Sequence, residues 1–216
     1  MAQYFPPDLG GSATRAFNVA KGLVQNGCGV TVVAAVPHYP HGKIPGEYRW
    51  CPVRVEWLDG FRVVRTFMPP LASRGFVRRL LLIWSFALSS LFALPFVGRV
   101  DAVWASSWMP GLVYSRVKRR PLALNEDDLT LEDLVDLRLV REGSFVLRVA
   151  ERVYRLFLMK GDVVTPISPG YVDTLVKKYQ VDENSVQVVR GGVDLAVFRR
   201  GPVRKGRGRP FRVVYS

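Results

Sequence analysis

Short apolar runs alternate with amphipathic stretches along most of the chain. Seven runs rich in β-branched and aromatic residues predict strands. They cover 30–36, 53–57, 61–67, 102–105, 122–124, 163–165 and 186–189. The second and third flank Asp59-Gly60, a dipeptide typical of a hairpin turn. Strands that alternate with helices indicate an α/β fold with a Rossmann-like, three-layer parallel sheet.

Two of the intervening stretches show clear helical periodicity. In the first, the residues that share one face are Ala16, Phe17, Ala20, Leu23 and Val24. Ser12 is the N-cap expected for this helix. In the second, which follows Ser144, they are Val146, Val149, Ala150, Val153, Leu156 and Phe157. Both patterns predict amphipathic helices.

The length of 216 residues suffices for one sizeable core. We assign 1–198 to a single domain. Only three residues precede the loop 4–11, which should follow a strand, so we expect a truncated first strand. A basic, glycine-rich linker follows at 199–210, and 211–216 is the expected first strand of a second domain.

The net charge of +13 and the isoelectric point near 10.3 indicate an anionic partner: nucleic acid, phospholipid or a phosphorylated substrate. The basic clusters at 116–120 and 199–212 lack interleaved aromatic residues, which argues against nucleic acid. Cys28 and Cys51 show no disulfide or metal spacing and suit a reducing compartment. We therefore expect a cytoplasmic protein.

No charged residue occurs from 80 to 97, and arginines stand on both sides. This run approaches the ~20 residues of a membrane-spanning helix. A crossing would separate strands of one sheet, which a single sheet cannot tolerate. We prefer a helix or helical pair, within 76–99, that lies on an anionic membrane surface through Phe76, Trp84 and Phe92. A helix packed on the sheet is an equal alternative, and both can hold.

Ligands of such folds gather in the loops that follow the strands. Gly10 and Gly11 precede a helix, where a backbone can approach a ligand closely and amides attract phosphate. A plain turn explains the pair equally well, since no dinucleotide or P-loop glycine motif is present. His38 and His41 flank a Tyr-Pro pair, but two histidines without a third ligand do not predict zinc. We expect neither a metal nor another cofactor.

Several ordered motifs resemble the retaining family-4 glycosyltransferases, above all the bacterial and archaeal branch that builds cell-surface polysaccharides on lipid carriers. They are YFPPDLGG at 4–11 with Arg15, GVTVV at 29–33, PHYPHGKI at 37–44, DGFRVVR at 59–65, and VRGGVD at 189–194 with Phe198. The likeness covers nearly the whole chain. Arg190 and Gly191 replace the family's proline and asparagine, and Thr130 replaces an aromatic residue.

The resemblance implies the N-terminal, acceptor-side half of a GT-B architecture, in which two Rossmann-like domains enclose a nucleotide sugar. The implied reaction transfers a sugar to a hydroxyl of a lipid-linked or polysaccharide acceptor, with retention and without a metal. The leaving diphosphate can take the acceptor proton. This chain alone is expected to be inactive, and to lie peripherally on the inner face of the cell membrane.

The resemblance also implies site residues. Asp128, after the strand 122–124, is the expected catalytic residue, and it would orient the acceptor hydroxyl. The expected substrate-binding residues are Gly10, Gly11, Arg15, His38, Tyr39, Glu132, Gly192 and Asp194. From the residues alone, Asp128 suits a helix N-terminal turn equally well, and for Glu126, Asp127 and Asp133 we prefer that interpretation.

Two other functions are compatible with the sequence. The first is a non-catalytic module that binds a membrane or a polyprenyl-phosphate glycan. The second is a dinucleotide-binding oxidoreductase domain, against which the missing glycine fingerprint and the double-proline loop argue.

Overall fold

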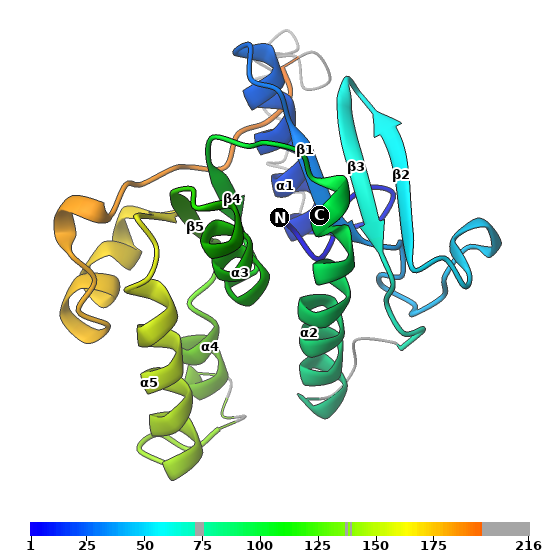
Figure 1. The fold of residues 1–216 in the computed structure, drawn as a ribbon. Helices are drawn as coiled ribbons and strands as arrows, with labels where there is room; N and C mark the ends of the chain where they lie inside the picture. The colour runs from blue at the N-terminus through cyan, green and yellow to red at the C-terminus, as the bar shows by residue number, and fades with distance from the viewer. Residues whose placement is uncertain (72–75, 137, 139, 196–216) are drawn as a thin grey trace, which may run out of the picture.

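The computed structural model describes residues 1–71, 76–136, 138 and 140–195 (Figure 1). Its strands are β1 (Thr31–Ala35), β2 (Val53–Leu58), β3 (Phe61–Thr66), β4 (Val103–Ala105), β5 (Leu122–Glu126) and β6 (Val163–Pro166). Its longer helices are α1 (Gly11–Gln25), α2 (Phe76–Ser90), α3 (Trp108–Lys118), α4 (Thr130–Asp136) and α5 (Phe145–Leu158). Short helical turns are η1 (Gly46–Tyr48), η2 (Leu91–Phe96), η3 (Pro169–Tyr171), η4 (Thr174–Lys178) and η5 (Glu183–Ser185).

The strands form the middle layer, with the order β2-β3-β1 in one half and β4-β5-β6 in the other. Residues 1–3 lie between the halves: the Ala2 amide donates to the Val33 carbonyl at 3.1 Å, and the Ser106 amide donates to the Met1 carbonyl at 3.0 Å. Neighbouring strands pair in parallel, except that β2 and β3 form the predicted antiparallel hairpin. The α/β, Rossmann-like prediction is confirmed, with one antiparallel edge strand.

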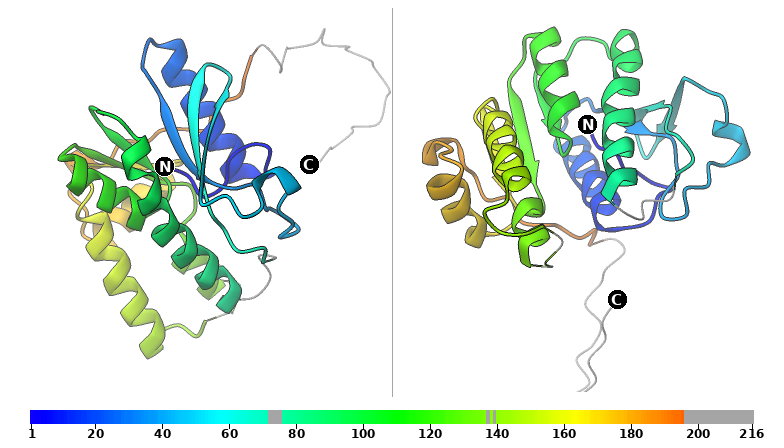
Figure 2. Two further views of the ribbon diagram at one scale, coloured as in Figure 1. Left: turned by 45° about the vertical axis from the view of Figure 1, so that its right-hand side comes forward. Right: turned by 90° about the horizontal axis from the view of Figure 1, so that it is seen from below.

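Helices cover both faces of this layer. α1 lies on one face, and α2, α3 and α5 form a row on the other (Figure 2). Side chains alternate between the two faces along β1, as in any strand. Val32 and Ala34 pack in the cluster under α1, whereas Val33 packs with residues of η2 and Ala35 with residues of α2.

Two local predictions are wrong. α1 begins at Gly11 with Gly10 as its N-cap, and no side chain caps it, so Ser12 lies inside the helix. The segment 186–189 forms no strand: Val186 makes only an isolated parallel bridge with Val164 on β6. Two further backbone hydrogen bonds, from the Gln187 amide to the Val164 carbonyl and from the Val189 amide to the Pro166 carbonyl, keep the chain beside β6 before it contacts α1.

The sheet covers the predicted apolar faces of α1 and α5 to different extents. In α1, Ala16 and Ala20 are buried, but Leu23 is exposed, contrary to its predicted place on the packed face. In α5, the helix packs through Leu147, Tyr154 and Leu158. The predicted apolar face therefore does not pack on the core. Four of its members are exposed: Val146, Val149, Val153 and Leu156.

The uncharged run 80–97 forms most of α2 and then η2. Leu82 and Phe86 pack in the core, while Trp84 and Phe92 are 55% and 66% exposed. The segment thus packs on the sheet, as one of the two alternatives predicted, and also presents an apolar outer face. Its contact with a membrane stays a prediction. No helix in the described part of the chain is long and apolar enough to cross a bilayer.

Some predictions fall on parts that the structure does not describe. The side chains of Phe76 and Asp133 and the segments 199–210 and 211–216 lie outside the described residues.

Candidate active site

Two cavities open at the carboxyl ends of the strands, where ligands of doubly wound folds bind. The first, of about 560 Å³, has walls that include Tyr4, Tyr39, Ile83, Trp108 and Asn125. We call it the α2 cavity, because Ile83 belongs to α2. Its lining mixes aromatic and aliphatic side chains with polar ones, which include Gln3, Ser106 and Ser107 as well as the groups at and after the end of β5.

The second cavity, of about 720 Å³, lies against α1 and is called the α1 cavity. Its walls include Asn18, Ile167, Arg190 and the glycine pair 191–192. Both cavities are also lined by Gly11, Ser12, Asp127 and Asp128. The N-terminus of α1 and the turn after β5 therefore form the junction between them.

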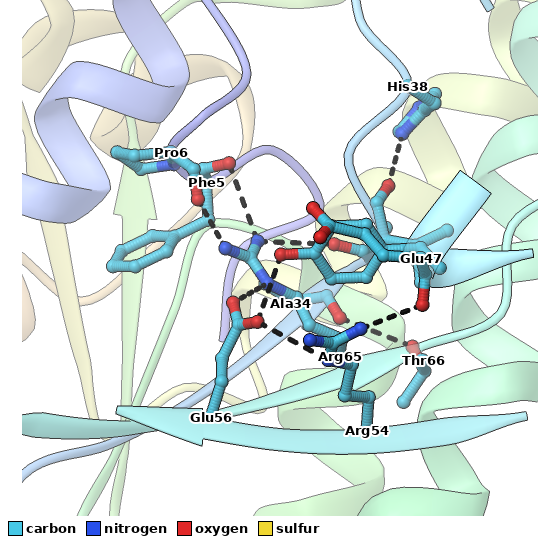
Figure 3. Close-up of polar contacts among 12 residues, drawn as sticks. Phe5, Pro6, Ala34, His38, Glu47, Arg54, Glu56, Arg65 and Thr66 are labelled. Carbon is cyan, nitrogen blue, oxygen red and sulfur yellow. Dashed lines mark hydrogen bonds and ion pairs between the residues drawn. The ribbon is translucent and has the colours of Figure 1, made fainter. Parts of the chain in front are cut away.

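A buried arginine holds the start of the loop 4–11 against the sheet (Figure 3). Arg65 of β3 is 1% exposed, and its Nε donates to Glu56 Oε1 at 2.7 Å. Its guanidinium also donates to the carbonyls of Phe5 and Pro6. A buried charge is tolerated only when it is paired and hydrogen-bonded. These contacts therefore fix the loop and the hairpin relative to each other.

Asp8 joins this loop to the loop that follows β1. Its Oδ1 accepts hydrogen bonds from the amides of His38 and Tyr39, both at 2.8 Å. Burial raises the pKa of Asp8, and the two amide hydrogen bonds oppose this rise. His38 is 3% exposed, and its Nδ1 lies 2.9 Å from the Val36 carbonyl. His38 thus supports the loops, whereas Tyr39 lines the α2 cavity.

Asp128 is exposed at the junction of the two cavities. Within the described part of the chain, its carboxylate has no hydrogen-bond or ion-pair partner. The neighbouring Asp127 instead forms an ion pair with Arg15. Both acids line the two cavities, but of the two only the carboxylate of Asp128 is not engaged by another described residue.

Comparison with known families identifies this architecture. Residues 10–192 match the glycosyl transferase 4-like domain family. This range includes all residues that line the α1 cavity, and all that line the α2 cavity except Gln3, Tyr4 and Leu9. The chain belongs to this family. No curated protein sequence matches the chain at a significant level.

The glycine pair of this glycosyltransferase domain lies where the loop enters α1. Gly10 has φ 136°, and a Cβ there would lie 3.3 Å from the Tyr39 ring. A Cβ on Gly11 would meet no atom within 4 Å. The conformation of Gly10 is almost restricted to glycine, so this residue sets the direction in which the first amides of α1 face the cavities.

Arg15, a predicted ligand-binding residue, is engaged by protein groups. It is 8% exposed, and its Nη2 donates to Asn125 Oδ1 at 2.9 Å and to the Val189 carbonyl at 2.8 Å. Arg15 also forms an ion pair with Asp127. Arg15 thus connects α1, β5 and the segment after β6, and it also lines the α1 cavity. Its predicted contact with a substrate stays a prediction.

α1 also holds the motif 189–194 beside the α1 cavity. Asn18 Nδ2 donates to the Gly192 carbonyl at 3.0 Å, and Lys21 Nζ lies 2.6 Å from Asp194 Oδ2. The hydrogen bond to Asp194 raises the pKa of Lys21. Gly192 therefore lines the cavity, while Asp194 positions the segment from outside it.

Glu132 lies in neither cavity lining of the glycosyltransferase domain. Its Oε1 accepts hydrogen bonds from Tyr179 Oη at 2.7 Å and from Lys178 Nζ at 2.9 Å. Glu132 belongs to α4, and its contacts hold this helix against the η4 region. It therefore supports the turn that carries Asp128 and does not lie beside Asp128 in a cavity.

Glu126 is a functional candidate that the sequence interpretation missed, because it was assigned to a helix N-terminal turn. It is 4% exposed at the end of β5 and belongs to the α2 cavity lining. Tyr154 Oη donates to Glu126 Oε2 at 2.6 Å, while the buried Oε1 has no hydrogen-bond partner among the described residues. Burial raises the pKa of Glu126 to about 7. The strand pattern carried the signal: Leu122, Leu124 and Glu126 share one side of β5.

The two histidines do not come together with other metal ligands. His41 is exposed, in contrast to the buried His38. Among the described residues, no group of three histidine, cysteine or acidic side chains could hold a metal ion.

Proposed function

We propose that this domain binds the acceptor in a glycosyltransferase that moves a sugar from a nucleotide-sugar donor to a hydroxyl of a lipid-linked or polysaccharide acceptor. The observation that supports this function most directly is the carboxylate of Asp128, which is unpaired among the described residues and lies at the junction of two cavities in a domain of a glycosyltransferase family. A carboxylate at this junction can accept a hydrogen bond from an acceptor in one cavity while the donor occupies the other.

The two cavities suit different substrates. In the α2 cavity, Ile83, Phe86 and Trp108 offer apolar and aromatic surface, which fits a sugar ring or the first part of a lipid carrier. In the α1 cavity, the exposed Arg190 and the N-terminus of α1 favour the phosphates of a nucleotide sugar. Arg190 stands where related sequences have proline, so this positive charge is a particular feature of the present chain.

The proposed reaction proceeds with retention and uses no metal ion. The bond between the anomeric carbon and the leaving diphosphate breaks, and a bond from that carbon to the acceptor oxygen forms on the same face. The acceptor proton passes to the diphosphate. Asp128 orients the hydroxyl, Gly10 and Gly11 allow close approach of the substrates, and the amides of α1 stabilise negative charge on the diphosphate.

We place this domain in a GT-B enzyme, as its acceptor-side half. A second Rossmann-like domain would supply most contacts to the donor nucleotide, and turnover would require it. The exposed apolar face of α2, within 76–99, suits a peripheral position on the cytoplasmic face of an anionic membrane. Synthesis of cell-surface polysaccharide on a lipid carrier fits this position.

The test is Asp128→Asn in the two-domain enzyme, assayed with a panel of radiolabelled nucleotide sugars and a polyprenyl-diphosphate-linked acceptor. We expect transfer to fall about 100-fold, since a positioned carboxylate contributes on this scale. Asp136→Asn is the matched control, because Asp136 is an exposed acid outside both cavities. Unchanged transfer in Asp128→Asn would contradict the role of Asp128.

The exposed face of α2 also favours the alternative of a non-catalytic module that binds a membrane or a polyprenyl-phosphate glycan. The same assay separates the two functions. Binding of the acceptor without hydrolysis or transfer of any nucleotide sugar in the panel would establish the non-catalytic module.

A further inference from the structure

The row of helices α2, α3 and α5, which we call the outer helical row, exposes large apolar side chains along its whole width. Trp84, Leu88 and Phe92 follow one another at four-residue spacing on α2 and η2, and all are more than half exposed. Val149 and Val153 form a similar stripe on α5. The outer face of a surface helix is normally polar. A surface of this kind marks an interaction site.

α3 connects the two stripes into one surface. Its Tyr114 Oη donates to the Ser90 carbonyl of α2 at 2.6 Å. On its other side, the Trp108 ring packs on Phe157 of α5, with ring centroids 5.4 Å apart. α3 adds the exposed Val117 between its neighbours. The outward faces of the three helices therefore belong to one layer of the fold (Figure 2).

Among the described residues, the unpaired charges on the outer helical row are all positive. Arg78 on α2, Arg116 on α3, and Arg148 and Arg152 on α5 are exposed, and they form no ion pair with any described residue. α2, η2 and α3 contain no acid, and the single acid of α5, Glu151, is paired with Lys178 at 2.7 Å. This surface lacks the acids that a second copy would need to oppose its arginines.

We propose that the whole outer helical row, and not α2 alone, docks on an anionic lipid bilayer, with the α5 stripe as a second apolar contact. Apolar side chains enter the interface while arginines meet acidic head groups. The proposal deepens the membrane association proposed above and rests on it. Since α2 also contributes Ile83 and Phe86 to the α2 cavity, an acceptor held in the bilayer would reach that cavity along α2.

The test is co-sedimentation of this chain with phosphatidylcholine vesicles, with and without phosphatidylglycerol. We expect binding to the anionic vesicles only, weakened by salt. Val149→Ser with Val153→Ser should weaken binding about 10-fold, because two apolar contacts are lost. The matched control is Trp57→Ser, which removes a 74% exposed apolar residue on β2, away from the row. It should bind as the parent chain does.

Three results would overturn the proposal. Unchanged binding of the α5 double variant would assign docking to α2 alone. Equal binding to neutral and anionic vesicles would remove the role of the arginines. A dimer, detected by light scattering and abolished by the α5 changes, would identify a second copy as the occupant. Asp128→Asn should bind vesicles normally, so failure of the proposed catalytic function is distinguishable from failure of docking.

Discussion

Positively charged side chains on the two faces of the sheet differ in whether they have acidic partners. On the α1 face, Arg15 is paired with Asp127, and Lys21 is paired with Asp194. On the outer helical row, Arg148 and its neighbours have no acidic partner among the described residues. Charges of the first kind shape the site and should matter for folding. Charges of the second kind are available to an external anion and should matter for binding.

The largest effect that separates the two faces is expected for Arg15→Ala. The change leaves Asp127 without its counter-charge and removes the hydrogen bonds to Asn125 and Val189. Breaking a buried pair from one side costs about 3 kcal/mol or more. Urea unfolding should show this loss of stability. The folded fraction should still sediment with anionic vesicles as the parent chain does.

Arg15→Lys is the control for this comparison. Lysine keeps the charge but not the planar fork of donors, so we expect an intermediate loss of stability. If Arg15→Ala unfolds at the parent urea concentration, the contacts of Arg15 do not stabilise the site, and the contrast between the faces fails.

A second effect concerns pH, through Glu126. Its pKa is about 7 in the folded chain and near 4.5 when unfolded. A raised acid pKa means that the folded state binds more protons between these values. The contribution of Glu126 to stability is therefore greatest below about pH 4.5, and up to ~3 kcal/mol of it is lost as pH rises through 7. Burial also raises the pKa of Asp8, so the parent curve alone does not isolate Glu126.

Glu126→Gln isolates this contribution. Glutamine keeps an oxygen that can accept from Tyr154 but cannot ionise. The variant should gain stability relative to the parent chain as pH rises from 4.5 to 8, as measured by urea unfolding across this range. If the free energies of unfolding of Glu126→Gln and the parent chain differ by the same amount at every pH from 4.5 to 8, Glu126 does not titrate in this range.

A third, smaller effect is expected for Gly10→Ala. Gly10 has φ 136°, and the added Cβ would press on the Tyr39 ring at 3.3 Å. Strain of this kind costs on the order of 2 kcal/mol. Thermal unfolding measures the cost, and Gly11→Ala is the matched control, because a Cβ on Gly11 meets no atom within 4 Å. Equal stability of both variants would contradict a special role for Gly10.

The sequence predicted the elements better than it predicted their contacts. Local periodicity located α5, because that signal is short-range. Asp128 was proposed from the family resemblance, since from the residues alone it suited a helix N-terminal turn equally well. The apolar arc of α5 is wider than the surface the sheet can cover, and only the packing of α3 and η4 shows that Tyr154, and not Val153, faces inward. Periodicity alone cannot make that distinction.

The polar contacts of the site were harder to foresee for the same reason. Arg15 and Asn125 are 110 positions apart, and their hydrogen bond exists only once α1 packs beside β5. Arg15 was therefore expected to offer its charge to a ligand. The burial of Glu126 was predictable in principle, since it continues the alternation of Leu122 and Leu124, but its acidic neighbours suggested a solvated turn.

The smallest effect on stability is expected on the outer helical row, for Arg148→Gln with Arg152→Gln. Both side chains are exposed and neither has an acidic partner among the described residues, so the free energy of unfolding should change by less than ~0.5 kcal/mol. Binding to anionic vesicles should nevertheless fall about 10-fold or more, because each arginine near an anionic surface contributes to attraction. Arg15→Ala should show the opposite pattern, with lower stability and unchanged binding to vesicles. A loss of stability together with unchanged sedimentation would show that these arginines serve the fold, as those on the α1 face do.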